Sequence, residues 1–177
     1  LDYFSPQLYW PIAPPAQSFT ALLDWWMGEN KQGRHVWPGM STGRIRDGSA
    51  KPYAVSAIVN QIDETRRRSG SPGHIHYSQK TFERNPDGVV MALQTGPYAQ
   101  RAVVPASPWL GATLPARPAV TGAREGTAWA LRIDAAAGST PFVYVISIKD
   151  GGGWRTDVVP VAGASTRYVL AGAAGVT

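Results

Sequence analysis

Hydrophobic positions in residues 1–104 alternate between short strand-like runs and helical stripes. The strand-like runs are Tyr3–Trp10, Arg34–Trp37 and His74–Tyr77, and Pro11 and Pro38 end the first two. Between them, apolar residues recur at the i, i+3, i+4, i+7 spacing of an amphipathic helix: Phe19, Leu22, Leu23 and Trp26, then Val55, Ile58, Val59 and Ile62. Ser18 precedes the first stripe as an N-cap. A helical turn at Ser78–Arg84 and a short helix at Asp87–Gln94 are expected to follow.

This alternation predicts an α/β fold with parallel strands, because parallel neighbours need a crossover connection that a helix usually supplies. Three such units cannot close a barrel, which needs eight of them and about 250 residues. The pattern therefore fits either a small open α/β domain or the last three β/α units of a TIM-type (β/α)8 barrel that is truncated upstream.

The composition changes near Pro105, where prolines bracket Trp109 and Leu110 as a stiff connector. Beyond it, β-type segments are separated by Gly- and Ala-rich turns without a helical pattern between them, as in an antiparallel sandwich. These segments are Thr127–Ile133, Pro141–Ile148, Trp154–Val159 and Arg167–Leu170, and Ala171–Thr177 reads as the start of another strand. We therefore expect one domain over residues 1–110 and an incomplete β-sandwich over residues 111–177.

Composition and charge exclude several classes of protein. No apolar run among the 177 residues reaches the ~18 that a membrane span requires. The absence of cysteine excludes disulfides and thiolate chemistry. A formal charge of +5 suggests nucleic-acid binding as one function. The basic residues are scattered, however, and the cluster Arg66–Arg68 suits a helix C-terminus. The chain starts at Leu1 without a charged leader, which we read as a mature product or a fragment.

Four segments in order carry a resemblance to a known family: Asp2–Pro11, Phe19–Trp26, Gly33–Gly39 and Gly73–Ser78. Together they resemble the late strands, and the helix between them, of the glycosyl hydrolase-like 10 family, and Pro97–Pro105 is similar to the barrel exit that often leads into a fibronectin type III-like domain. The resemblance implies a bacterial, secreted, periplasmic or envelope-associated glycosidase. It further implies a glycan substrate such as peptidoglycan, and a barrel whose first five strands are missing here.

Glycoside hydrolysis usually requires two carboxylates about 5–10 Å apart. Within the expected barrel segment, only Asp47 follows a strand end on the active side, and a single loop aspartate is more often a turn residue. The catalytic residues are therefore unknown, and we expect the pair to lie upstream. The strand ends instead present groups that stack on sugar rings or bind their hydroxyls, and these are our candidate substrate-binding residues: Gln7, Tyr9, Trp10, Trp37, His76 and Ser78.

Neither a cofactor nor a metal is expected. His74 and His76 share a strand face, but a metal site needs three or four ligands, and His35 is the only other histidine. Two further interpretations remain open. One is a carbohydrate-binding or wall-anchoring module without catalysis, and the other is a small α/β domain whose basic face binds anionic partners.

Overall fold

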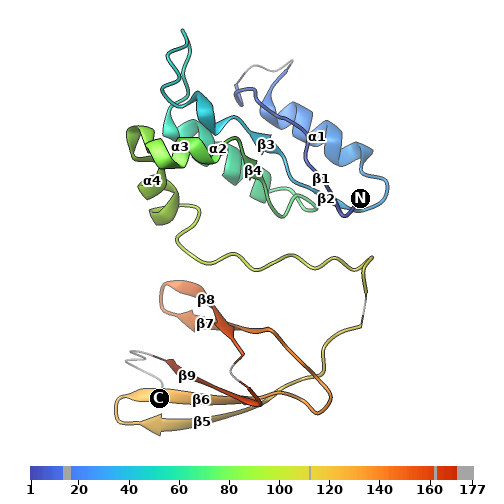
Figure 1. Ribbon diagram of the computed structural model, residues 1–177, viewed down its shortest axis with the longest axis vertical. Helices are drawn as coiled ribbons and strands as arrows, with labels where there is room; N and C mark the ends of the chain where they lie inside the picture. The colour runs from blue at the N-terminus through green and yellow to red at the C-terminus, as the bar shows by residue number, and fades with distance from the viewer. Residues whose placement is uncertain (14–16, 112, 162, 171–177) are drawn as a thin grey trace. The chain divides into compact units, whose positions relative to one another are not determined.

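The computed structural model describes residues 1–13, 17–111, 113–161 and 163–170, so the strand start expected at Ala171–Thr177 lies outside the described residues. The chain divides into two compact units, which are drawn in Figure 1. The first unit contains Leu1–Ala99 and Pro105–Ser107, and the second contains Gln100–Val104 and Pro108–Thr177.

The first unit carries all the helices of the described residues. Its elements in order are β1 (Tyr3–Phe4), α1 (Phe19–Glu29), β2 (His35–Val36), β3 (Gly39–Met40), η1 (Thr42–Arg44), α2 (Val55–Arg66), β4 (Ile75–His76), α3 (Gln79–Arg84), η2 (Pro86–Gly88) and α4 (Val89–Thr95). The helices expected from the apolar stripes are confirmed. Ser18 caps α1 as expected, because its Oγ accepts a hydrogen bond from the backbone N–H of Ala21 at 3.1 Å.

The strand segments of this unit pair in parallel, as the alternation predicts. β1 pairs with β2, β3 pairs with β4, and a parallel bridge joins Gln7 to Gly39. Each strand is only two residues long. Pro6 and Pro38 interrupt the ladders because proline has no N–H to donate, although the carbonyl of Pro6 still accepts from Gly39 N at 2.8 Å.

The core lies on one side of these strand segments. Leu8, Val36 and Met40 are buried in the same cluster as helix residues, among them Phe19 and Leu23 of α1 and Ile58 and Ile62 of α2. Side chains alternate between the two faces of a strand, so the neighbours of Leu8, Val36 and Met40 point to the opposite face. That second face, the open face, is free of the helical core.

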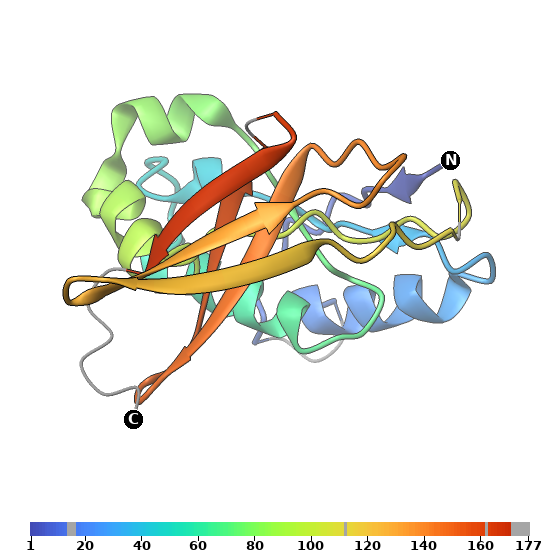
Figure 2. The same ribbon diagram turned by 90° about the horizontal axis from the view of Figure 1, so that it is seen from below.

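The second unit is antiparallel throughout its described strands. Strands β5 (Ala119–Glu125), β6 (Ala128–Asp134) and β9 (Ser165–Leu170) form one sheet, and β7 (Val143–Asp150) and β8 (Gly153–Pro160) form another. Figure 2 shows the long hairpin of β5 and β6 with β9 beside β6. Strand β5 was not expected from the sequence, because Ala119–Glu125 is exposed along its whole length and shows no apolar alternation.

The predicted fold class, a truncated TIM-type barrel followed by a partial sandwich, is wrong. In the described residues, the parallel strands form two separate two-stranded sheets, whereas a barrel needs one continuous ladder. A sandwich requires two sheets with apolar inner faces packed together. In the described part of the second unit, however, Ala130 and Ile133 are the buried hydrophobic residues.

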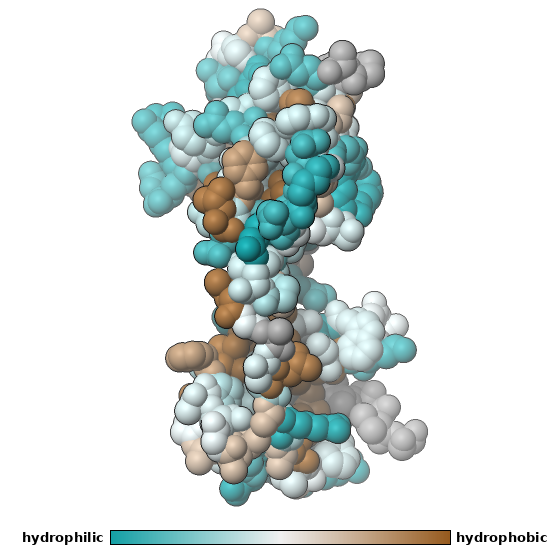
Figure 3. All heavy atoms as spheres, turned by 90° about the vertical axis from the view of Figure 1, so that its right-hand side faces the viewer, coloured by the Kyte–Doolittle hydropathy of each residue, from teal (hydrophilic) through white to brown (hydrophobic). Residues whose placement is uncertain are grey.

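Several hydrophobic side chains of the second unit are exposed instead. They include Phe142 at 91% and Trp154 at 61% of their full exposure, and Figure 3 shows hydrophobic residues in brown at the surface. Among the helices of the described residues, none combines the length and the hydropathy needed to cross a bilayer.

Candidate functional site

The open face of the strand segments is built from residues that lie side by side in register. Gln7 lies opposite Gly39, and Gly39 lies opposite Ile75, so these residues form one row across three segments. By alternation, Tyr9 follows Gln7 and Tyr77 follows Ile75 on the same face, while Trp37 precedes Gly39. The middle of the row has no side chain, because a Cβ added at Gly39 would lie 3.3 Å from the carbonyl oxygen of Pro6 and 3.7 Å from Ser5 Oγ. Gly39 itself is buried, so the closely packed backbone forms the floor between the aromatic groups.

Trp37 lies at one end of this floor within a stack of rings. Its indole is stacked on Tyr3 with a centroid distance of 4.4 Å and on His35 with 5.6 Å. In the segment before β4, a Cβ added at Gly73 would lie 3.2 Å from Trp37 Nε1, so the glycine leaves space that the indole uses. The Nε1–H group of Trp37 is buried and has no hydrogen-bond partner.

Tyr9 and Tyr77 lie at the other end of the floor. Their ring centroids are 5.9 Å apart, and Tyr77 keeps 62% of its full exposure. The backbone fixes both tyrosines, since Tyr53 Oη donates to the carbonyl of Tyr9 at 3.1 Å and Gly43 N donates to the carbonyl of Tyr77 at 2.9 Å. Burial, and then the neighbouring Tyr77, raise the pKa of the Tyr9 phenol, which therefore stays protonated and can donate a hydrogen bond.

Of the six residues predicted to bind substrate, Gln7, Tyr9 and Trp37 are brought together on this face. Trp10 is exposed next to it, and its carbonyl accepts from Gln61 Nε2 at 2.9 Å. His76 lies on the opposite face, because its register partner is Met40, which is fully buried in the core. The binding role of each of these residues stays a prediction.

His76 belongs to a hydrogen-bonded network with His74, Tyr98 and Thr42. Its Nδ1 lies 2.7 Å from Thr42 Oγ1, its Nε2 lies 2.6 Å from Tyr98 Oη, and His74 Nε2 bonds to the same phenol oxygen. Burial lowers the pKa of His74 to about 3 and that of His76 to about 4, so both imidazoles are neutral at pH 7. The network ties the segment after α4 to strand β4.

Ser78 lines a separate pocket at the carboxyl ends of β3 and β4. This pocket has a volume of about 280 Å³, and its lining includes Arg46, Asp47, Lys80 and Arg84. Asp47, the one carboxylate expected on the active side, accepts from Ser49 N at 3.0 Å and lies 3.7 Å from Arg44 Nε. The Ser49 side chain, and then its backbone N–H, lower the pKa of Asp47, so this carboxyl is ionised and cannot act as an acid near neutral pH.

Acid–base chemistry has no visible pair in the described part of the chain. Every carboxyl pKa there that departs from its ordinary value is lowered, as expected for carboxylates that accept hydrogen bonds: Asp24, Asp47, Glu64, Asp134 and Asp157. A general acid of a glycosidase needs the opposite shift. Within the same residues, no three of the histidine or carboxylate side chains come together as metal ligands.

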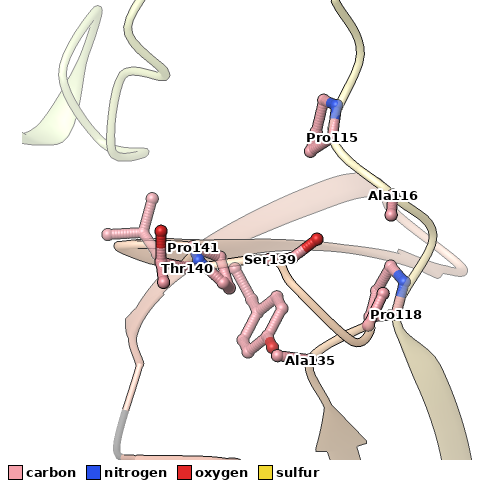
Figure 4. Close-up of a pocket in the computed structure, with 10 residues that line it drawn as sticks. Pro115, Ala116, Pro118, Ala135, Ser139, Thr140 and Pro141 are labelled. Carbon is pink, nitrogen blue, oxygen red and sulfur yellow. The ribbon is translucent and has the colours of Figure 1, made fainter.

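A second cavity lies in the second unit and is drawn in Figure 4. Its volume is about 340 Å³, and small or apolar residues such as Pro115, Pro118 and Ala135 dominate its lining. Tyr144 also lines it, and the hydroxyl of Tyr144 is buried without a hydrogen-bond partner. Among the described lining residues, Tyr144 is the single aromatic group and none is charged.

Sequence reasoning left Tyr3, His35, Gly39 and Gly73 out of the site. The alternation of side chains along a strand could have identified two of them. Tyr3 shares a face with Gln7 and Tyr9, and His35 shares a face with Trp37. The contributions of the two glycines could not be found in this way, because they depend on which strands become neighbours.

No family model matches this chain. A search of curated proteins finds the protein named Glycosyl hydrolase YngK from Bacillus subtilis (strain 168), which is 34% identical over 127 residues. The matched residues make up 71% of this chain but 25% of that protein, so the chain spans only a part of its relative. The chain is therefore related to a protein named as a glycosyl hydrolase.

Proposed function

We propose that this chain is part of a glycoside hydrolase and that its open aromatic face contacts the glycan. The observation that carries the proposal is the arrangement of Trp37, Gln7 and the pair Tyr9–Tyr77 around Gly39. Aromatic rings flank a floor without side chains, and a sugar ring can stack on them while Gln7 bonds to its hydroxyls. The similarity to a protein named Glycosyl hydrolase YngK supports the same class.

The finer assignment is also part of the proposal. The ordered segments that resemble the glycosyl hydrolase-like 10 family favour a bacterial envelope protein that acts on peptidoglycan or a related polysaccharide. The reaction is hydrolysis by a carboxylate acid and base. Because the described residues offer no such pair, we propose that residues of the parent protein outside this chain supply it.

The proposal predicts weak glycan binding by this chain. Stacking on one or two aromatic rings supplies only a few kcal/mol, so the dissociation constant for a short oligosaccharide is expected to be about millimolar. Chitotetraose titrated into ¹⁵N-labelled protein should shift the amide signals of Gln7, Tyr9 and Tyr77. Trp37→Ala should weaken binding about tenfold, since it removes the largest ring on the face.

Trp25→Ala is the matched control. Trp25 is a tryptophan with 56% of its full exposure, and it belongs to α1, away from the open face. Equal losses of affinity in the two variants, or no binding by the unmodified chain, contradict the proposed site.

A second candidate function is glycan binding without catalysis, favoured by the lowered pKa values of the carboxyl groups. The two candidates differ in the parent protein, since only a glycosidase releases reducing ends from its substrate. This chain alone is expected to show no turnover. If it does hydrolyse a glycan, and Asp47→Asn abolishes that activity, the catalytic assignment has to move to Asp47.

A further inference from the structure

We propose that the pocket beside Ser78 binds the carboxylate of an acidic sugar, so that the glycan held on the aromatic face is anionic. This inference rests on the proposed function, because it assigns a substrate class to the same site. Uronic acids and the lactyl ether of muramic acid are two such groups, and they serve as the two probes.

The pocket lies between the loop that follows β3 and helix α3. Its volume of about 280 Å³ is enough for a substituent of a sugar ring, and its walls carry the hydroxyls of Ser78 and Thr81 beside three cationic side chains, Arg46, Lys80 and Arg84. Ligands of parallel strands usually bind at the carboxyl ends, and this pocket lies where β3 and β4 end.

The single carboxylate in the lining does not neutralise these cations. The carboxylate of Asp47 bonds within its own loop, where it accepts a hydrogen bond from Ser49 N. It also lies 3.7 Å from Nε of Arg44, which is outside the pocket lining. Arg44 is held in place in turn, because its guanidinium lies 4.8 Å from the centre of the Tyr53 ring. Asp47 is thus paired with Arg44 and not with Lys80 or Arg84.

Lys80 and Arg84 are the cations available to a ligand. Within the described residues, neither forms an ion pair with a carboxylate, and the nearby Glu83 accepts from Gln79 Nε2 at 3.0 Å instead. The two lie four positions apart on α3, where like charges destabilise a helix. A bound carboxylate relieves this repulsion and gains charge-assisted hydrogen bonds.

Arg46 also lines the pocket, but its charge is already paired with Asp87, which lies outside the lining. Its Nε lies 2.8 Å from Asp87 Oδ1, and its φ of 51° lies in the left-handed region that non-glycine residues rarely adopt. The other non-glycine residues of the described chain with positive φ are Asn85 and Asp87, which flank the lining residue Pro86. Unfavourable backbone conformations therefore gather in the two loops of this pocket, as they do at ligand sites.

The pocket also adjoins the aromatic face. Tyr77 directly precedes Ser78, and the carbonyl of Tyr77 accepts from Gly43 N, which belongs to the pocket lining. A sugar stacked on Tyr9 and Tyr77 can therefore place a carboxylate substituent, or that of the next residue, between Lys80 and Arg84.

The test compares three tetrasaccharides by NMR titration at low and high salt. These are chitotetraose, which is neutral, its counterpart with a lactyl carboxylate on every second sugar, and a hyaluronan tetrasaccharide with uronic acids. We expect at least one acidic ligand to bind about tenfold more tightly than chitotetraose, to lose this advantage at high salt, and to shift the amide signals of Ser78 and Thr81. The tighter of the two acidic ligands identifies the source of the carboxylate.

The variant Lys80→Gln/Arg84→Gln should remove that advantage and leave chitotetraose binding unchanged. Lys31→Gln/Arg67→Gln, which removes the same charge outside the pocket, should preserve it. The inference is overturned if neutral and acidic ligands bind equally, or if the two double variants behave alike. In either case the proposed function stands as long as Trp37→Ala weakens chitotetraose binding, and it fails separately if none of the three ligands binds.

Discussion

Trp37 shows how a glycine can help to position a large side chain. Gly73, in the segment before β4, leaves space that the indole uses, and Tyr3 and His35 hold the indole by stacking. The indole N–H without a partner is a cost to the fold, since a buried donor normally finds an acceptor.

The substitution Gly73→Ala is expected to displace the indole. The new methyl group would lie 3.2 Å from Trp37 Nε1, and overpacking of this kind costs about 1–3 kcal/mol. Urea unfolding followed by far-UV circular dichroism reports the first unit, since the helices of the described chain lie there. Gly28→Ala is the control, because a Cβ at Gly28 has free space and alanine favours a helix, so stability should stay equal or rise. Equal destabilisation by both substitutions contradicts the packing argument.

The neutral pair His74 and His76 predicts a loss of stability in weak acid. Their pKa values are about 3 and about 4 in the folded chain against an ordinary value of 6.5, so below pH 6.5 the unfolded chain binds more protons. Stability is therefore fully present above that pH and falls as the pH decreases, by up to about 1.4 kcal/mol per pH unit for each histidine.

Urea unfolding between about pH 7 and pH 5 measures this slope, before most carboxyl groups titrate. His74→Gln should reduce the slope by about half, because one of the two neutral imidazoles is removed. An unaltered slope in His74→Gln means that this imidazole is not held neutral by its surroundings.

At the scale of elements, Arg68 connects the two main helices. Its Nε lies 2.6 Å from Asp24 Oδ1 of α1, and its Nη1 lies 2.9 Å from Glu64 Oε2 of α2. The sequence predicted that Arg66–Arg68 would complement the C-terminal end of α2. It could not show which arginine bridges to another helix, because that depends on how α1 and α2 pack.

Arg68→Gln should lower the free energy of unfolding of the first unit by about 1 kcal/mol, since one substitution breaks both ion pairs. Arg67→Gln is the matched control, because Arg67 pairs with the same Glu64 but its side chain is 69% exposed. It should cost less than about 0.5 kcal/mol. Raising the salt concentration should reduce the difference in the free energy of unfolding between the two variants. A difference that does not change with salt contradicts an electrostatic origin.

Individual helices and strands are largely predictable from the sequence, but their pairing and orientation are not. The stripe of Val55, Ile58 and Ile62 predicts α2 because a buried helical face needs that spacing. The expected strand Tyr3–Trp10 is reduced to Tyr3–Phe4 and a bridge at Gln7, since Pro6 breaks the ladder. His76 was assigned to the same lining as Tyr9, but which face of a strand meets the helices is decided by tertiary packing. The barrel was inferred from the order of the elements, which does not fix how many strands join one sheet.

For the whole molecule, the two units differ in how much apolar surface they bury. The first has a continuous cluster from Leu8 to Leu93, while Ala130 and Ile133 are the buried hydrophobics in the described part of the second. In β7, Val143 and Val145 remain nearly half exposed, and Phe142 just before it is 91% exposed. Exposed apolar side chains along a strand favour association with other chains.

The chain is therefore expected to self-associate as its concentration rises. Sedimentation velocity should show a growing weight-average sedimentation coefficient, and Phe142→Ser/Val145→Thr should reduce this growth. Thr121→Ser on β5 changes little apolar surface and serves as the control. A concentration-independent monomer in the unmodified chain contradicts this expectation.

The hydrogen bonds of Tyr98 and Ser107 to the histidines of the first unit have a mechanical consequence. The phenol of Tyr98 is bonded to two histidines at strand β4, and Ser107 Oγ lies 3.3 Å from Nε2 of His35 on β2. Tension applied to the chain beyond residue 108 reaches the His35–Ser107 bond first and the Tyr98 bonds next. The force therefore acts on the strand segments first. Helix α4 is not pulled from the first unit until both sets of hydrogen bonds are broken.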